Sequence, residues 1–438
     1  MAKKEEGITT TAQSAVMQAL LRKNQETYGH SFVMARDSDV LFVGLPFKHL
    51  SLMYLFDSTV FPLSKVVGFA GAPKSMKSAL GFEIMRWFAE ANGYGFLAEC
   101  EGGKYSPSLH KSIVGPRLWD EDRFAIKCCA TIQEAQEFLT SVTKLVKTEN
   151  PERNVPYCLM IDSLVGAGTE EGAAQLFKDG SLGERGFPRE ALAWSGFFRN
   201  FPASLTSWPI SFVFINHLKQ GIDSRGGPPI ERVSGGDRQI FHSAFVINVY
   251  RRGKDSHETI EKDGETQYLP NDTRTIRLKT WFTSGGTDGR DIRTDFTWYT
   301  ENGEQKSWFD WEGSTAYLLS ELQEDKSRSG DRSTLADHCD VAETNKRFSS
   351  KKLGVSKVSA TELGKAAEAD AKLIDELQAF WGIHKHPQFV DHMLTVDEIR
   401  RLKGAFTAPL AAPAPPAAPE IKIPKLDAKA GKNDLDIG

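Results

Sequence analysis

The stretch Gly71-Ala-Pro-Lys-Ser-Met-Lys-Ser78 decides the fold of this chain, because it joins a strand-like run to a helix-like run. The flanking runs are residues 65–70 and 79–88. Backbone N–H groups in such a turn can surround a polyphosphate, and the positive end of the following helix favours negative charge. The spacing fits the pattern G-x-x-x-x-G-K-[ST], except that Met76 occupies the place of the second glycine. We therefore predict a phosphate-binding loop in which Lys77 neutralises phosphate charge and Ser78 binds Mg²⁺.

Beyond this loop, short apolar runs alternate with helical patterns, which is typical of β-α-β crossovers and a mostly parallel sheet. The strand-like runs are residues 94–98, 124–129, 157–161, 210–215 and 244–250, and the helical runs are residues 132–146 and 189–198. After residue 270, alternating runs separated by Gly- and Asn-rich turns predict antiparallel strands. These runs are residues 274–279, 293–299 and 306–310. The predicted core is thus an α/β fold with an antiparallel extension.

Polar side chains follow several of the predicted strands, where an open α/β sheet binds its ligands. Asp162 ends a strand whose carboxylate can support Mg²⁺, and Glu101 is placed to polarise an attacking water molecule. Asn216 and His217 end the next strand and can sense the γ-phosphate. Taken singly, each residue is also compatible with a turn, a cap or an exposed loop acid.

Composition and charge limit the number of folded units and the kinds of surface that this chain can have. The 438 residues are 40% hydrophobic with a formal net charge of −4, so we expect two or three folded units and no uniformly basic surface. Residues 178–254 nevertheless contain eleven Lys and Arg against six Asp and Glu, which marks a candidate polyanion surface. We find no apolar run of about 18 residues and no apolar segment at the N-terminus, and therefore expect a cytoplasmic protein without membrane contact. The five cysteines lack metal-type C-x-x-C spacing, so we expect reduced, structural thiols.

Taken in order, residues 56–320 resemble the RecA-family homologous recombinases, in particular the phage recombinases of the UvsX kind. The strongest match is the segment that begins Ser234-Gly-Gly and runs through a strand into Arg251-Arg252. Met76 before the loop lysine and His217 after the sensor asparagine also match the phage branch. The resemblance implies a RecA-like P-loop ATPase core that uses ATP and Mg²⁺. It further implies a homo-oligomeric filament on single-stranded DNA that pairs with homologous duplex DNA, with a possible loading factor and single-strand-binding protein, in the host cytoplasm if phage-encoded.

The resemblance also carries over individual roles. The implied cofactor-binding residues are Gly71, Ala72, Pro73, Lys74, Ser75, Met76, Lys77, Ser78 and Ala79, and the implied metal-binding residues are Ser78 and Asp162. The implied catalytic residues are Glu101, Lys77, His217 and Lys279, the last acting on the ATP of a neighbouring subunit. A second lysine of that pair is replaced by Trp281, which puts a two-lysine mechanism in doubt. The implied DNA-binding residues lie in and beside two loops, residues 164–189 and 219–234, and are Phe187, Arg189, Ser195, Arg199, Lys219, Arg225, Arg232, Gly235 and Gly236. Phe187 could equally stack on bases or anchor the following helix.

We predict a central core flanked by segments whose sequences indicate less about function. We expect an N-terminal oligomerisation segment at residues 1–55 and the ATPase core at residues 56–324. A linker at residues 325–345, a small helical module at 346–407 with a capping box at Thr395–Glu398, and a disordered Pro/Ala-rich tail at 408–438 complete the chain. Two other functions stay open at this point: a hexameric DNA helicase with a RecA fold, and a recombination mediator that does not hydrolyse ATP.

Overall fold

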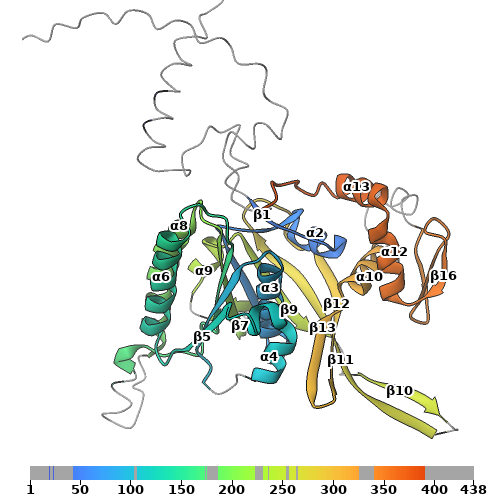
Figure 1. Ribbon diagram of the computed structural model, residues 1–438, viewed down its shortest axis with the longest axis horizontal. Coiled ribbons are helices and arrows are strands. Elements are labelled where there is room, and N and C mark those ends of the chain that lie inside the picture. The colour runs from blue at the N-terminus through green and yellow to red at the C-terminus, as the bar shows by residue number, and fades with distance from the viewer. Residues whose placement is uncertain are drawn as a thin grey trace, which may run out of the picture.

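The computed structural model describes residues 43–102, 106–172, 174, 186–221, 230–234, 236–252, 256–262, 265–324 and 340–389, together with residues 19 and 23. Most of these residues form an α/β unit around one large sheet, with a smaller unit at the C-terminal end of the described chain (Figure 1). The predicted N-terminal segment before residue 43, apart from residues 19 and 23, lies outside the described residues, as do the capping box at Thr395–Glu398 and the Pro/Ala-rich tail. Among those described, no helix is both long enough and apolar enough to cross a membrane.

The central sheet has the strand order β13-β12-β11-β9-β3-β7-β6-β4-β5. Its parallel part consists of β3 (Val66–Gly71), β4 (Tyr94–Glu99), β5 (Phe124–Cys128), β6 (Tyr157–Asp162), β7 (Ile210–Gly221) and β9 (Phe245–Arg251). The chain places β3 between β7 and β9, and then crosses over β7 and β6 to reach β4. This crossover creates a switch point beside the carboxyl end of β3, which is where open α/β sheets bind ligands.

Helices cover both faces of this parallel part. The helix after the phosphate loop, α3 (Lys77–Glu90), packs on one face with α4 (Pro107–Val114) and the short α5 (Pro116–Trp119), while α6 (Ile132–Glu149) and α8 (Gly186–Leu205) lie on the other (Figure 1). A hydrophobic core lies on each face of the sheet, and successive residues of β6 point into different cores. Met160 packs with α3, and Leu159 packs with α6 and α8. Burial on both faces explains why these strands are almost continuously apolar.

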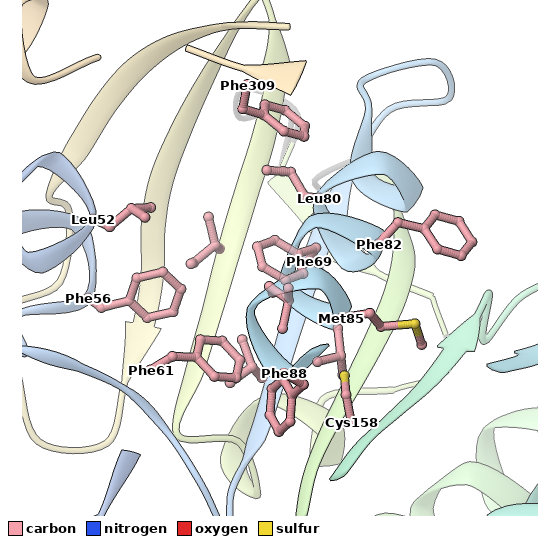
Figure 2. Packing of buried hydrophobic residues seen from close by; sticks show 14 of the residues in the cluster. Leu52, Phe56, Phe61, Phe69, Leu80, Phe82, Met85, Phe88, Cys158 and Phe309 are labelled. Carbon is pink, nitrogen blue, oxygen red and sulfur yellow. The ribbon is translucent and has the colours of Figure 1, made fainter. Parts of the chain in front are cut away.

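The larger core lies under α3. Figure 2 shows Phe82, Met85 and Phe88 of α3 beside Phe69 of β3 and Cys158 of β6. Phe56 and Phe61 extend this core toward the N-terminal elements β1 (Gly44–Pro46), α2 (Leu50–Phe56) and β2 (Val60–Pro62). Residues 43–55, predicted to belong to an N-terminal oligomerisation segment, therefore pack into the main core.

The predicted antiparallel extension is present. β11 (Glu265–Thr283) pairs with β9, β12 (Asp291–Glu301) pairs with β11, and β13 (Glu304–Phe309) pairs with β12. β10 (Ser256–Lys262) pairs with the first half of β11, and this hairpin projects from the body of the molecule (Figure 1). β8 (Ile230–Val233) pairs with the end of β7, so that the base of the second predicted loop is a β-hairpin. Two further helices belong to this unit: α9 (Arg238–Phe241), which precedes β9, and α10 (Trp311–Glu324), which follows β13.

The C-terminal unit contains a sheet that the sequence pattern did not predict. The predicted helices are present as α12 (Ala360–Ala369) and α13 (Ala371–Phe380), but β14 (Ala342–Thr344), β15 (Arg347–Ser350) and β16 (Val355–Val358) form a three-stranded antiparallel sheet beside them. These strands are three or four residues long, too short for a clear alternation of polar and apolar residues. The purely helical description of this module is therefore corrected, and part of the predicted linker forms β14.

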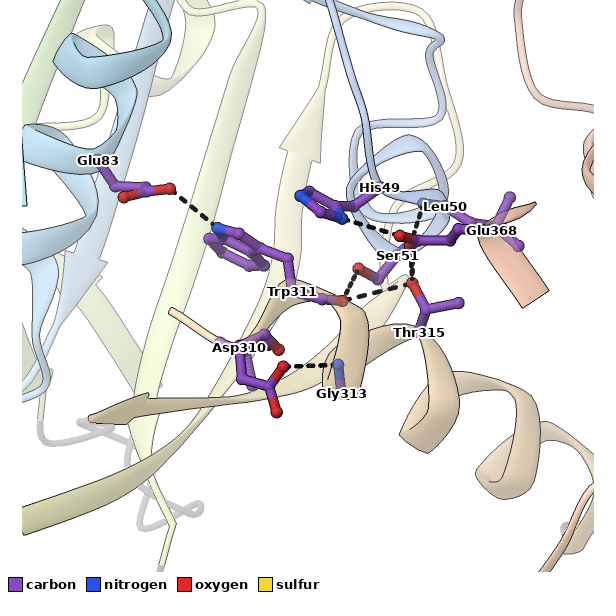
Figure 3. A network of polar contacts seen from close by, with 10 residues as sticks. His49, Leu50, Ser51, Glu83, Asp310, Trp311, Gly313, Thr315 and Glu368 are labelled. Carbon is purple, nitrogen blue, oxygen red and sulfur yellow. Dashed lines mark hydrogen bonds and ion pairs between the residues drawn. The ribbon is translucent and has the colours of Figure 1, made fainter. Parts of the chain in front are cut away.

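A polar network attaches this unit to the core. Glu368 of α12 accepts hydrogen bonds from the backbone N–H of Leu50 and the hydroxyl of Thr315, and its carboxylate also contacts His49 (Figure 3). In the same view the indole of Trp311 donates to the buried carboxylate of Glu83 on α3. Contacts of this kind fix the orientation of α12 relative to α2 and α10.

Candidate nucleotide site and adjoining loops

The phosphate loop adopts the backbone conformation that a glycine at position 76 would favour, although Met76 occupies this position. Met76 lies in the left-handed region with φ 71° and ψ 21°, immediately before α3 begins at Lys77. An L-residue in this region loses roughly 1–2 kcal/mol relative to the right-handed conformation. Two contacts from β11 hold the loop in place: Arg274 Nη1 donates to the carbonyl of Lys74 at 3.1 Å and contacts the sulfur of Met76 at 3.3 Å. The chain thus forms the predicted turn without a glycine at this position.

Lys77 and the residues around it line a cavity of 440 Å³ at the carboxyl end of the parallel sheet. The lining includes most of the predicted loop, residues 73–79, and polar side chains from three other strands, β4, β6 and β7, are brought together here. These polar side chains are Glu99, Glu101, Asp162 and His217. Lys77 is almost completely buried, and its Nζ donates to the carbonyl of Ala72 at 2.7 Å. A cationic amine enclosed by a turn of backbone N–H groups is suited to bind an anion.

Asp162 is the carboxylate nearest to the start of α3. Burial raises its pKa to about 6; the nearby Glu101 and Glu99 add to this rise, and a hydrogen bond from the Ser78 hydroxyl and the charge of Lys77 oppose it. Within the described part of the chain, its buried Oδ1 has no hydrogen-bond partner. A hydroxyl and a carboxylate oxygen with unused acceptor capacity form a donor set that suits Mg²⁺, which prefers oxygen ligands and retains several water molecules.

Glu101 is held by side chains from two other strands. Its Oε1 accepts a hydrogen bond from the Ser163 hydroxyl at 2.8 Å and lies 3.1 Å from His217 Nε2. Its backbone N–H donates to Glu99 Oε1 at 2.8 Å, so the preceding acid fixes the turn that carries Glu101. A carboxylate oriented in this way at the edge of a cavity can accept a proton from a water molecule.

Asn216 connects the cavity to the segment that follows β8. It is fully buried, and its Nδ2 donates to the carbonyl of Ser234 at 2.8 Å and to Gln239 Oε1 at 2.7 Å. Gln239 Nε2 in turn donates to the carbonyls of Ser234 and Gly236 at 2.6 and 2.7 Å. Since His217 contacts Glu101, a short chain of hydrogen bonds links the cavity to the start of α9.

Two of the predicted DNA-binding residues that the structure describes, Gly236 and Ser195, lie close together. A Cβ atom added to Gly236, whose φ is +90°, would lie 3.9 Å from the hydroxyl oxygen of Ser195 on α8. Arg199 is exposed one turn further along α8, and Arg232 is exposed on β8. Arg189 is also exposed but forms an ion pair with Glu171 at 2.6 Å, so part of its charge is already neutralised.

The remaining predicted residues are described less fully or lie elsewhere. Arg225 and Gly235 lie outside the described residues, and for Phe187 and Lys219 only the backbone is described, in α8 and β7. Lys279 lies on β11, opposite Asn248 of β9 and Asp291 of β12, and is not among the residues that line the cavity. The structure of a single chain therefore does not bring Lys279 to the site.

Sequence reasoning missed two polar residues that hold the site together. Ser163 bonds to Glu101, and Gln239 bonds to Asn216, Ser234 and Gly236. Ser163 directly follows Asp162, and this adjacency was its only signal in the sequence. Gln239 lies in a four-residue helix, which is too short to show periodicity.

No family model matches this chain, and no curated protein sequence matches it.

Proposed function

We propose that this protein is a DNA-dependent ATPase that assembles on single-stranded DNA and drives homologous pairing and strand exchange. The observation that carries the proposal is the convergence of Lys77, Asp162 and Glu101, each from a different strand end, on one 440 Å³ cavity. Together with the resemblance of residues 56–320 to the RecA-family recombinases, this convergence favours ATP hydrolysis coupled to DNA.

In the proposed reaction, the backbone of residues 71–77 and the amine of Lys77 bind the β- and γ-phosphates. Ser78 and Asp162 would hold Mg²⁺, which neutralises phosphate charge when bound. Glu101, fixed by Ser163 and His217, orients the attacking water molecule and accepts its proton as the bond to the γ-phosphate breaks.

Coupling to DNA follows from the hydrogen bonds beyond the cavity. A γ-phosphate beside Glu101 would compete for the contacts of His217, and the adjacent Asn216 holds Ser234 and Gln239. The second predicted loop ends at Ser234, so a shift of Asn216 changes the position of that loop. Contacts from Ser195, Arg199 and Arg232 to phosphates would give affinity without sequence preference.

The test is ATP hydrolysis with and without circular single-stranded DNA. We expect DNA-stimulated hydrolysis in the parent protein, a loss of ATP binding in Lys77→Ala, and a decrease in kcat of about 10²–10⁴-fold in Glu101→Gln. Lys144→Ala is the matched control, because it removes an exposed lysine of α6 that does not line the cavity and should leave hydrolysis nearly unchanged. If the parent protein binds DNA but shows no DNA-stimulated hydrolysis, the result would instead favour the non-hydrolysing mediator.

A second measurement separates the proposed recombinase from a ring helicase with the same phosphate loop. Electron microscopy with ATP and single-stranded DNA should show helical filaments, and closed rings would contradict the proposal. Joint-molecule formation between single-stranded DNA and a homologous duplex, absent with a heterologous duplex, is the outcome expected only of a recombinase.

A further inference from the structure

Two cysteines that the proposed reaction does not use lie beside its acidic residues. Cys100 directly follows β4 and separates Glu99 from Glu101 in the sequence, and Cys129 directly follows β5. In the parallel pairing of these strands Glu99 lies opposite Cys128, and the N–H of Cys129 donates to the carbonyl of Glu99 at 2.8 Å. Cys100 and Cys129 are therefore the next residues opposite each other along the two strands.

This placement allows a disulfide. Neighbouring strands lie about 4.8 Å apart, and the Cα atoms of a disulfide are usually about 4.4–6.8 Å apart. Residues opposite each other point to the same face of the sheet, and both side chains belong to the core under α6 and α8. The strand spacing and the shared face therefore place the two side chains where the geometry of a disulfide is allowed.

We propose that Cys100 and Cys129 form a reversible oxidation site that a peroxide converts into a disulfide. The sulfur of Cys129 attacks one peroxide oxygen, the O–O bond breaks, and a sulfenic acid forms as the first water molecule leaves. The sulfur of Cys100 then attacks the sulfenic sulfur, the S–O bond breaks, and the second water molecule leaves with the proton of Cys100. Two thiols lose two electrons in total, and hydrogen peroxide gains them.

The environments of the two sulfurs support this order of events. The neighbouring Cys100 side chain lowers the pKa of Cys129, against the burial that raises it, and the charge of Lys127 also favours the thiolate. A thiolate is the form that reacts with peroxides, and a neighbouring thiol is the usual partner that resolves a sulfenic acid. The side chains of Cys100 and Cys129 are only 4% and 5% exposed, so a small oxidant is the class of reagent that fits.

The disulfide has a consequence for the site that rests on the proposed function. A bond of about 2.05 Å between the sulfurs would draw the end of β4 toward β5. Glu101 follows Cys100 and depends on Ser163 of a different strand end for its orientation. We therefore expect oxidation to move Glu101 out of position and to lower ATP hydrolysis at least tenfold, with recovery after dithiothreitol.

The experiment uses the full chain carrying Cys128→Ser, which removes the exposed neighbouring thiol so that a cross-link can be assigned. After treatment of the folded protein with hydrogen peroxide, peptide mass mapping without reductant should show Cys100 joined to Cys129, with both free again after dithiothreitol. A matched Cys128→Ser/Cys129→Ser protein should show no such peptide and retain more than half of its ATP hydrolysis after peroxide.

The possible outcomes distinguish the two proposals. If both thiols remain available to iodoacetamide after peroxide, or if Cys129 is oxidised without a cross-link, the oxidation site is disproved. If the cross-link forms and hydrolysis persists, the consequence for Glu101 is disproved. The mass measurement does not depend on ATP hydrolysis, so a protein without ATPase activity would disprove the proposed function and still test the disulfide.

Discussion

At the scale of single residues, the buried carboxylate of Asp162 suits a charged ligand but destabilises the folded protein when no ligand is bound. Burial raises the pKa of Asp162 to about 6 from its ordinary 3.8, so the folded protein holds a proton at this carboxyl more tightly than the unfolded chain does. The carboxylate is therefore neutral in both states at low pH. Its ionisation destabilises the folded state progressively as the pH rises from 3.8 toward 6.

We predict that Asp162→Asn increases the free energy of unfolding of the nucleotide-free protein at pH 7, by up to about 3 kcal/mol. The gain should shrink as the pH falls from 6 and be absent below 3.8, because the parent carboxyl is then protonated. Urea denaturation at a series of pH values measures it. Asp120→Asn, at an exposed carboxylate, is the control, and an equal gain at pH 7 and at low pH would contradict the prediction.

At the scale of elements, β7 and the four-residue α9 are joined by the side chain of Gln239, which bonds to Asn216. Its amide accepts from Asn216 and donates to two carbonyls of the segment after β8, all within 2.6–2.7 Å. Since these groups are buried, removal of the amide leaves them without partners. The position of this segment therefore depends on one side chain rather than on the helix itself.

We predict that Gln239→Ala lowers the free energy of unfolding by about 1–3 kcal/mol and abolishes the stimulation of ATP hydrolysis by DNA. Affinity for ATP should be preserved, because Lys77, Ser78 and Asp162 are unchanged. Equilibrium titration with a fluorescent ATP analogue and hydrolysis assays separate the two effects. Gln136→Ala removes a hydrogen bond between α6 and α8 and is the control; normal DNA stimulation in Gln239→Ala would refute the coupling.

A further prediction concerns α8 as a surface for phosphates. Removing one side chain that binds a phosphate should reduce the slope of log K against log salt concentration by about 0.7 for single-stranded DNA. Arg199→Ala should therefore weaken binding to unrelated sequences about equally and reduce the slope by this amount. Fluorescence anisotropy at several salt concentrations is the measurement. Arg117→Ala removes an exposed arginine from α5 with the same change in net charge, and an identical slope change there would show that Arg199 acts only through net charge.

At the scale of the whole molecule, a buried arginine joins the core to the C-terminal unit. Arg290 Nη1 lies 3.0 Å from Asp57 Oδ1, its Nη2 donates to the carbonyl of Trp381 at 2.6 Å, and its guanidinium lies over the ring of Tyr54. The side chains of Arg290 and Asp57 are only 9% and 5% exposed. Removing one member of such a pair leaves a buried charge without its partner.

We predict that Arg290→Met lowers the free energy of unfolding by about 3–5 kcal/mol. The matched control is Arg277→Met, because Arg277 is 45% exposed and its ion pair with Asp291 is worth at most about 1 kcal/mol. Chemical denaturation measures both. Adding Asp57→Asn to Arg290→Met should recover part of the loss, and a loss no greater than that of the control would show that this buried pair does not stabilise the molecule.

The sequence by itself determined the alternation of buried strands and helices and the polar residues at strand ends. These features are local: a strand buried on both faces must be apolar along its length, and a turn before a helix shows its spacing directly. It thus predicted the strands of the central sheet, the antiparallel extension and the meeting of Lys77, Glu101 and Asp162 at one edge.

Only the tertiary structure decided which strands lie side by side and which distant residues touch. Packing between elements decided the order of β3 between β7 and β9 and the contacts of Gln239 and Ser163. It also decided the thiol pair and the short strands β14–β16. A side chain that acts through a partner in another element leaves no periodic signal. The energy of such a contact exists only once the core has brought the two segments together.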